Sequence, residues 1–439
     1  MARFLFTVWP FAGHVNPTMA IAHALRTRGH VAAFYTGKSV CPLVEGEGFR
    51  GFPFMKDDEE RLYCLARPFY HFPSFWTQLR RAKEFKAGLR EWLLDTIPQQ
   101  IEDLEPVLAE WQPDVLVCET ALWGPILVLH ETRRIPMAIF STVAACLLPG
   151  PDAPAWGRGL PRPRNRSARL RSRLEREVVR WLSADFRAGV NALRRRYGLP
   201  PLRISVTEFA GQMPLYLVPS TPEFDYERRD LPSSVHYVGP CLWDKSSHEP
   251  PPAWLAQLPH DRPVVHVTEA TVHMQEPLLL RTAARALGDR PMHVVMTTGG
   301  HRDPADLDLG PLASNIRVER YVPHSDLLPR TAVVVTMGGA GTVLAALKAG
   351  VPLVVVPTEW DKPENAQRVV EAGAGLRLEP NRCTPERLRG AVERVLQEPS
   401  FRQNAERLAA AFSRYGGAAR AAELLEAFSR QCPAVSPVV

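Results

Sequence analysis

Short, continuously apolar segments alternate with helical segments along two separate stretches of this chain. Runs of this kind are typical of parallel strands buried on both faces, and parallel neighbours need a crossover connection that is usually a helix. The alternation therefore predicts an α/β fold with parallel sheets. The predicted strands are residues 4–9, 31–35, 114–118, 137–141 and 214–219 in the first stretch, and 264–268, 293–297, 316–319, 332–336 and 353–356 in the second.

A proline-rich segment at residues 240–263 separates the two stretches. A single hydrophobic core rarely grows past about 250–300 residues, and this chain has 439. We therefore expect two α/β domains joined by a linker. The predicted divisions are a first domain at 1–240, a linker at 241–262, a second domain at 263–400, and helices with a tail at 401–439.

Composition argues against several other classes of protein. The seven cysteines are scattered without a C-x-x-C pair, so neither a zinc site nor a disulfide framework is expected. The amino-terminal residues run straight into a strand-like segment and lack the pattern of a signal peptide. The apolar stretch Val333–Pro357 is cut by glycines and Pro352, which favours strand, loop, helix and strand over a membrane span. Together these features predict a cytoplasmic protein.

The formal net charge is only +6, but arginines gather between Arg158 and Arg173. That run contains no aromatic residues that could stack on bases, so nucleic acid is not an expected partner. We interpret it as a solvated loop that enters a charged helix over residues 167–197. An anionic membrane surface or an acidic partner is the alternative interpretation.

Candidate catalytic residues follow two of the predicted strands in the first domain. His14 lies in the loop after residues 4–9, just before Asn16 and Pro17, which suit the start of a helix. The positive end of that helix would disfavour the imidazolium and keep His14 neutral, as a general base requires. Glu119 lies at the carboxyl end of the predicted strand 114–118 and could orient the imidazole. Alone, Glu119 is equally consistent with a partly solvated loop residue.

Two loops of the second domain carry candidate ligand-binding residues. Met337-Gly338-Gly339-Ala340-Gly341-Thr342 lies between a strand and a helix, where free backbone N–H groups can cradle a diphosphate. It lacks the third glycine of the dinucleotide fingerprint and the lysine of a P-loop. The loop Glu359–Asn365 is rich in groups that hydrogen-bond hydroxyls, and Trp360 could stack on a sugar ring. No Asp-x-Asp pair lies near Asp361, so we do not expect it to bind a metal ion.

Taken together, these motifs resemble glycosyltransferases of the GT-B fold, in the group that contains UDP-glycosyltransferases and bacterial macrolide glycosyltransferases. The resemblance covers most of the chain and is loose over 60–210. Its motifs are Gly13–Pro17, Tyr237–Pro240, Val267–Val272, Tyr321–His324, Gly338–Thr342 and Asp361–Ala366. It implies two Rossmann-like domains facing each other across a cleft, with the C-terminal helices crossing back to the first domain.

The resemblance also implies roles for individual residues. His14 matches the base that activates the acceptor, and Glu119 its acidic partner. Val322 and His324 fall in the nucleobase segment, and Asp361 and Lys362 where the family contacts the donor sugar. The full donor-binding set that we predict is Gly13, Thr271, Val322, His324, Met337, Gly339, Gly341, Thr342, Trp360, Asp361 and Lys362. The predicted acceptor-binding residues are Phe11, Phe75, Trp76 and Phe140.

The implied activity is inverting transfer of a sugar from a UDP- or dTDP-linked donor to a hydroxyl of a small lipophilic acceptor, without a metal ion or bound cofactor. A lipid acceptor would add peripheral contact with a membrane. Three donor-side positions depart from the family's usual residues: Met337 stands for histidine, Ala345 for glutamate and Lys362 for glutamine. These departures motivate the alternative of a binding or scaffold protein that has lost donor binding. An oxidoreductase is disfavoured by the missing dinucleotide fingerprint.

Overall fold

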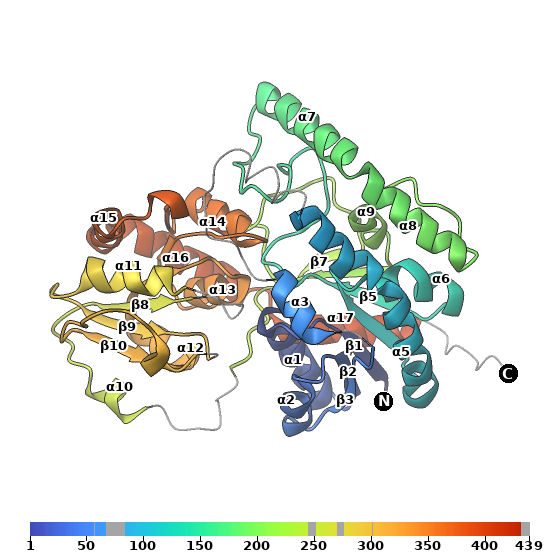
Figure 1. Cartoon of the computed structure of the whole chain (residues 1–439), viewed down its shortest axis with the longest axis horizontal. Helices are drawn as coiled ribbons and strands as arrows, with labels where there is room; N and C mark the ends of the chain where they lie inside the picture. Colours follow the sequence, from blue (N-terminus) through green and yellow to red (C-terminus); the bar gives the residue numbers. More distant parts are fainter. Residues whose placement is uncertain (57, 67–83, 245–251, 270–275, 301, 432–439) are drawn as a thin grey trace.

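The computed structural model describes the chain except residues 57, 67–83, 245–251, 270–275, 301 and 432–439. The described strands form two parallel sheets, one in each half of the chain (Figure 1). Each sheet starts in its middle, adds two strands to one side and then returns to the other, which is the Rossmann strand order. The prediction of two Rossmann-like α/β units is confirmed.

The first sheet has the order β3-β2-β1-β4-β5-β6-β7, with every described pair parallel. Short β3 and β7 were not predicted, because a few residues give too little apolar pattern to distinguish from loop. The strands are β1 (Arg3–Thr7), β2 (Val31–Thr36), β3 (Arg50–Pro53), β4 (Val115–Glu119), β5 (Met137–Phe140), β6 (Leu215–Val218) and β7 (Val235–Tyr237).

The helical segments of this half cover both faces of the first sheet. The predicted helix at 167–197 is two helices, α7 and α8, which are separated at Ser183. The helices are α1 (Ala12–Thr27), α2 (Cys41–Gly46), α3 (Glu59–Ala66), α5 (Ile97–Trp111), α6 (His130–Arg133), α7 (Arg166–Leu182), α8 (Ala184–Arg196) and α9 (Val206–Ala210), with π-helical turns at Glu91–Asp95 and Pro125–Leu129.

The second sheet has the order β10-β9-β8-β11-β12-β13, and its described pairs are also parallel. The strands are β8 (Val264–Thr268), β9 (His293–Thr297), β10 (Ile316–Glu319), β11 (Thr331–Thr336), β12 (Leu353–Val355) and β13 (Gly375–Arg377). The helices are α10 (Ala253–Gln257), α11 (Leu278–Leu287), α12 (His324–Leu327), α13 (Ala340–Lys348), α14 (Lys362–Glu371), α15 (Pro385–Gln397), α16 (Pro399–Ser413) and α17 (Ala418–Gln431).

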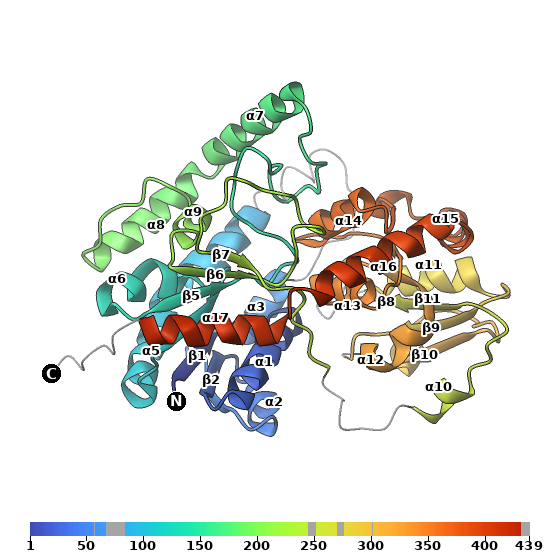
Figure 2. The same cartoon turned by 180° about the vertical axis from the view of Figure 1, so that it is seen from behind.

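The last helix returns to the first half of the molecule. Helix α16 packs on α13. Helix α17 packs against α1 and covers the same face of the first sheet (Figure 2). Leu425 and Phe428 of α17 join the core that contains Met19 and Ile21 of α1. The chain changes direction at Gly416 and Gly417, both at positive φ, and the N–H of Gly417 donates to the carbonyl of Val238. The predicted return to the first half is made by α17, whereas α16, which was also expected to cross, stays on the second half.

No helix in the described part of the chain combines the length and the apolarity that a membrane span requires. The apolar stretch Val333–Pro357 forms β11, α13 and β12, as its glycines and Pro352 predict.

Candidate active site

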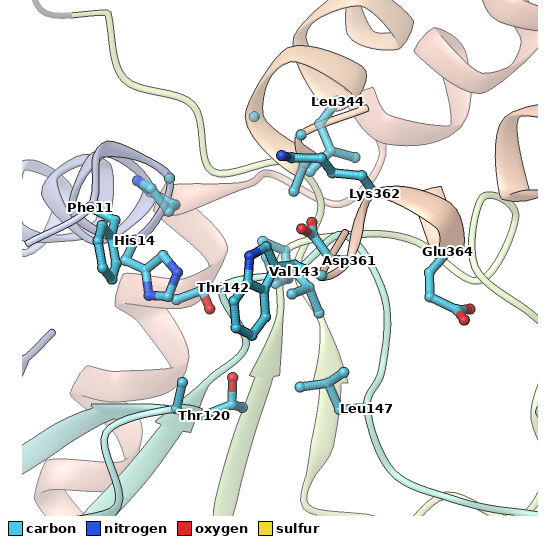
Figure 3. A pocket seen from close by; sticks show the side chains of 18 of the residues that line it. Phe11, His14, Thr120, Thr142, Val143, Leu147, Leu344, Asp361, Lys362 and Glu364 are labelled. Carbon is cyan, nitrogen blue, oxygen red and sulfur yellow. The ribbon is translucent and has the colours of Figure 1, made fainter. Parts of the chain in front are cut away.

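A cavity of about 1240 Å³ lies between the two halves. Its lining residues follow the carboxyl ends of central strands in both sheets, where open α/β sheets bind their ligands. In the first half these are loops after β1, β4 and β5, and in the second half loops after β8, β11 and β12. Figure 3 shows His14 from the first half and Asp361 from the second reaching into the same space.

His14 lies in the first turn of α1 and pairs with Glu119 at the end of β4. The helix begins at Ala12, earlier than Asn16 and Pro17 predict, so Pro17 sits inside its first two turns. The Nδ1 atom of His14 lies 2.5 Å from Oε2 of Glu119, whose side chain is fully buried. Because a carboxylate accepts, Nδ1 carries the proton and Nε2 is left with its lone pair.

The charge of Glu119 changes the expected protonation of His14. Burial lowers the pKa of His14, but the charge and hydrogen bond of Glu119, with a contribution from Asp361, leave that pKa above its ordinary value. The expectation that the positive helix end disfavours the imidazolium is therefore corrected, because the pKa of His14 is raised. A carboxylate in direct contact outweighs the partial charge of a helix end.

Asp361 and Lys362 begin α14 on the opposite wall of the cavity. Burial raises the pKa of Asp361, although Lys362, Asn365 and His14 oppose the shift. Burial lowers the pKa of Lys362, against the charges of Asp361, Glu359 and Glu269. The Nζ atom of Lys362 donates to Oγ1 of Thr358 at 2.8 Å. The amide of Asn365 donates to Oδ2 of Asp361 at 2.8 Å, so both side chains are held in place at the cavity.

The glycine loop ends at the start of α13 and faces the cavity. Gly338 has φ +91°, and a Cβ there would lie 2.7 Å from Val355. Gly339 and Gly341 differ, because a Cβ at either would meet no described atom within 4 Å. The amide of Asn365 donates to the carbonyl of Gly338 at 2.9 Å and fixes the loop. The backbone can therefore be approached closely at the end of the helix that favours anions.

The segment predicted to hold the nucleobase forms another part of the wall. Val322 and His324 line the cavity, and burial lowers the pKa of His324 below its ordinary value despite the charge of Asp244. Asp244 accepts from the hydroxyl of Tyr321 at 2.6 Å and from the backbone N–H of Ser325 at 2.8 Å. A residue at the start of the linker thus holds this segment by two hydrogen bonds.

Aromatic side chains form the wall beside His14. Trp360 has φ +66°, an uncommon backbone conformation for a bulky residue, and its Nε1 donates to the carbonyl of Ala66 at 3.0 Å. Its ring packs edge-on against Trp92 with centroids 5.2 Å apart. Phe11 packs edge-on against His14 at 5.5 Å. Trp360, predicted to stack on a sugar, therefore also joins the two halves of the protein.

Two predicted site residues lie in cores instead of at the cavity, among the residues that the structure describes. Phe140 is fully buried on the face of the first sheet that α1 and α17 cover, because alternation along β5 places Ile139 and Phe140 on opposite faces. Met337 continues the alternation of Val333 and Val335 into the core of the second half. The predictions that the Phe140 side chain contacts the acceptor and that the Met337 side chain contacts the donor are therefore wrong.

The other predicted residues divide into three sets. Thr271, Phe75 and Trp76 lie outside the described residues. Glu119 stands behind His14. The remaining residues line the one cavity, namely Phe11, Gly13, His14, Val322, His324, Gly339, Gly341, Thr342, Trp360, Asp361 and Lys362.

Glu269 follows β8 and lines the cavity, although its position was not predicted from the sequence. Burial raises the pKa of this carboxyl to about 7, although Arg302, the backbone N–H groups of Leu280 and Leu279, and Lys362 oppose the shift. Its Oε1 atom has no hydrogen-bond partner among the described residues. A charged residue directly after a buried strand was the available signal, as it was for Glu119.

A buried charge network across the two halves was also missed. Arg368 of α14 pairs with Asp225 of the first half and with Glu364, one turn earlier in α14. The Oε1 atom of Glu364 accepts the backbone N–H groups of Gly157 and Gly159, each at 2.9 Å. The network therefore connects α14, which begins with Asp361 and Lys362, to a loop that lines the other side of the cavity.

Comparisons with known proteins agree with this architecture. Residues 285–422 match the family model described as Erythromycin biosynthesis protein CIII-like, C-terminal domain. The chain is 37% identical to 4'-demethylrebeccamycin synthase of Lentzea aerocolonigenes, over 97% of this chain and 99% of the relative. It is 30% identical to demethyllactenocin mycarosyltransferase of Streptomyces fradiae, over 97% and 86%. The crystal structure of the calicheamicin glycosyltransferase CalG4 is similar with a TM-score of 0.72 and 25% identity, over 99% and 100%.

Proposed function

This chain belongs to the macrolide-type glycosyltransferases of the GT-B fold, and on that basis we propose that it transfers a sugar from a nucleoside diphosphate to a hydroxyl of a small lipophilic acceptor, with inversion and without a metal ion. One observation carries the proposal. The imidazole of His14, paired with Glu119, and the glycine-lined start of α13 come from opposite halves and line the same cavity.

In the proposed reaction, Nε2 of His14 takes the proton of the acceptor hydroxyl while the oxygen attacks the anomeric carbon. The bond to the diphosphate breaks in the same step, so a single displacement inverts the configuration. Glu119 stabilises the imidazolium that forms, as a carboxylate does for histidine in other transfer reactions. The backbone N–H groups at the start of α13 stabilise the negative charge that develops on the leaving diphosphate.

We propose a UDP- or dTDP-linked donor. Support comes from three groups of residues in the second half that line the cavity, namely Val322 with His324, Gly339–Thr342, and Asp361 with Lys362. The family resemblance assigns these three groups to the nucleobase, the diphosphate and the sugar of the donor, respectively. Ala345 and Lys362 line the cavity at positions where the family usually has other residues, so they are the first candidates for setting the donor sugar.

A lipophilic acceptor is supported by the apolar wall beside His14. Phe11, Trp92, Trp123, Val143 and Leu147 all line the cavity there. Such a wall buries an apolar ligand while His14 and Thr142 offer the polar contacts that fix its orientation. The alternative of a scaffold protein gains no support from the relatives named above.

The test uses calorimetry and product analysis. UDP, dTDP and GDP are titrated into the protein. Sugar-linked forms of each nucleotide that binds are then incubated with a panel of phenolic and polyketide acceptors in the presence of EDTA. We expect binding of UDP or dTDP, and a product whose anomeric configuration is inverted relative to the donor. Absence of binding by any of the three nucleotides at millimolar concentration would instead support the scaffold alternative. A retained configuration would overturn the single displacement.

A further inference from the structure

Helix α7 carries an apolar stripe on its outer side. Leu170, Leu174, Val178 and Trp181 recur at helical spacing and therefore share one face. Their exposed fractions are 59%, 59%, 55% and 75%. Both views of the molecule show α7 at the outer edge of the first half (Figures 1 and 2). Solvated surface helices normally direct such residues inward, so this stripe requires an explanation.

The inner side of the same helix already holds it against the protein. Ser172 is buried there, and Arg176 donates to the carbonyl of Ala153 at 3.0 Å. Arg176, Val179 and Arg180 line the cavity. The contacts that fix α7 in the fold are thus made by a different face, and the outer stripe is left for another contact.

Arginines border the stripe on both sides. On a helical wheel Arg166 and Arg173 fall on one edge of the stripe and Arg171 on the other. None of these three makes an ion pair or hydrogen bond with any residue that the structure describes. Glu177, which falls near the stripe, is already paired with Arg180. The face therefore combines exposed apolar side chains with unpaired positive charge.

We propose that α7 is a docking surface for an anionic lipid membrane. Leucine, valine and tryptophan side chains would enter the interface between head groups and acyl chains, while the bordering arginines extend to the lipid phosphates. A helix with this division of residues lies in the plane of a membrane surface and does not span it. The inference goes beyond the transfer reaction and does not depend on it.

Charge distinguishes a membrane from a second copy of the chain as the occupant. Helix α7 contains six arginines and two glutamates. A two-fold contact would place this face against itself and bring the unpaired arginines of both copies together, which is unfavourable. An anionic surface pairs with all of them, and each basic side chain near such a surface strengthens binding.

The test is sedimentation of the full-length protein with vesicles of phosphatidylcholine, with and without about one third phosphatidylglycerol. We expect binding to the anionic vesicles that weakens as salt is added. Leu174→Glu and Trp181→Glu should each reduce binding about tenfold. Arg171→Gln and Arg173→Gln should each reduce it about fivefold. Matched controls in the second half are Leu312→Glu and Arg387→Gln, whose side chains are also exposed.

Thermal midpoints of all variants establish that each is folded. Equal binding to both kinds of vesicle, or equal loss in Leu174→Glu and Leu312→Glu, would overturn the proposal. Light scattering measures the oligomeric state and so tests whether a second copy of the chain covers the stripe. A dimer in solution that Leu174→Glu converts to a monomer would assign the stripe to a second copy of the chain and overturn the membrane assignment.

Discussion

Arg368 and Asp225 form an ion pair in the interior, with Nε of Arg368 donating to Oδ1 of Asp225 at 2.9 Å. The two residues come from different halves of the chain, and their side chains are only 3% and 1% exposed. Glu364 pairs with the same guanidinium at 3.0 Å. Since α14 begins with Asp361 and Lys362, this pair fixes the donor-side wall of the cavity relative to the first half. The two halves are thus positioned by a buried charge as well as by α17.

Replacing Arg368 should therefore destabilise the whole molecule. Arg368→Met leaves the carboxylates of Asp225 and Glu364 buried without their cation, and breaking such a pair costs about 3–5 kcal/mol. Arg414→Met is the matched control, since Arg414 also pairs across the halves, with Glu223, but at an exposed site. We expect less than about 1 kcal/mol there. Urea denaturation of both variants makes the comparison, and similar losses would contradict the role of the buried pair.

The role of His14 predicts a selective loss of transfer. His14→Ala should lower the single-turnover rate about 10²–10⁴-fold, the usual contribution of a positioned base, because no other group takes the hydroxyl proton. Nucleotide affinity and thermal midpoint should stay near those of the unchanged protein. His23→Ala, on the same helix but away from the cavity, is the control and should retain the rate. A near-normal rate in His14→Ala would remove His14 from the mechanism.

The pair with Glu119 predicts a shift in the pH profile. His14 acts as a base only when unprotonated, so kcat/KM should rise with pH through the pKa of His14, which lies above its ordinary value. Glu119→Gln removes the negative charge and should lower that pKa, so the rising limb moves to lower pH. The plateau should also fall, because the imidazolium loses its stabilising carboxylate. A limb that stays in place would show that Glu119 does not set this pKa.

The positions of His14 and Glu119 could be predicted because each follows an apolar strand. Strand order then brings them together, since β1 and β4 are neighbours at the point where the order of the sheet reverses. The glycine loop at 337–342 could be predicted for the same reason, as it follows β11. The order of the strands therefore determines where many residues of this site lie. That order can be predicted from apolar segments that are separated by glycine-containing loops.

Side-chain direction and long-range pairing could not be read from the sequence. The sequence predicts Phe140 at the acceptor site, but alternation along β5 places its side chain in the core on the face that α1 and α17 cover. The raised pKa of His14 depends on a contact with Glu119 that only the folded geometry defines. Arg368 and Asp225 are separated by 143 residues. No local pattern links such residues, because nothing in their neighbours distinguishes a buried charge from a solvated one.

Two glycines in one loop should respond differently to substitution. Gly338→Ala meets both a positive φ and a Cβ position 2.7 Å from Val355, so the thermal midpoint should fall. Gly341→Val adds a side chain where a Cβ meets no described atom within 4 Å, so the fold should tolerate it. The added side chain would, however, occupy the space proposed for the diphosphate. We expect weaker nucleotide binding by calorimetry with a thermal midpoint near that of the unchanged protein, and unchanged affinity would contradict the diphosphate assignment.

Glu269 predicts a dependence of stability on pH. Burial raises the pKa of its carboxyl from 4.5 to about 7, so the folded protein holds a proton that the unfolded chain releases between these values. Its contribution to stability is therefore full below about pH 4.5 and is lost as pH rises through about 7. A shift of this size corresponds to about 3 kcal/mol.

Glu269→Gln removes this titration and keeps the shape of the side chain. Relative to the unchanged protein, the variant should gain stability as pH rises, with the difference approaching about 3 kcal/mol above pH 7. Urea denaturation at about pH 5 and about pH 8.5 measures the difference at both ends. Glu406→Gln, at an exposed site on α16, is the control and should show the same difference at both values. If Glu269→Gln also behaves alike at the two ends, the carboxyl is ionised in the folded protein, and its burial beside Lys362 and Arg302 must be compensated by their charge.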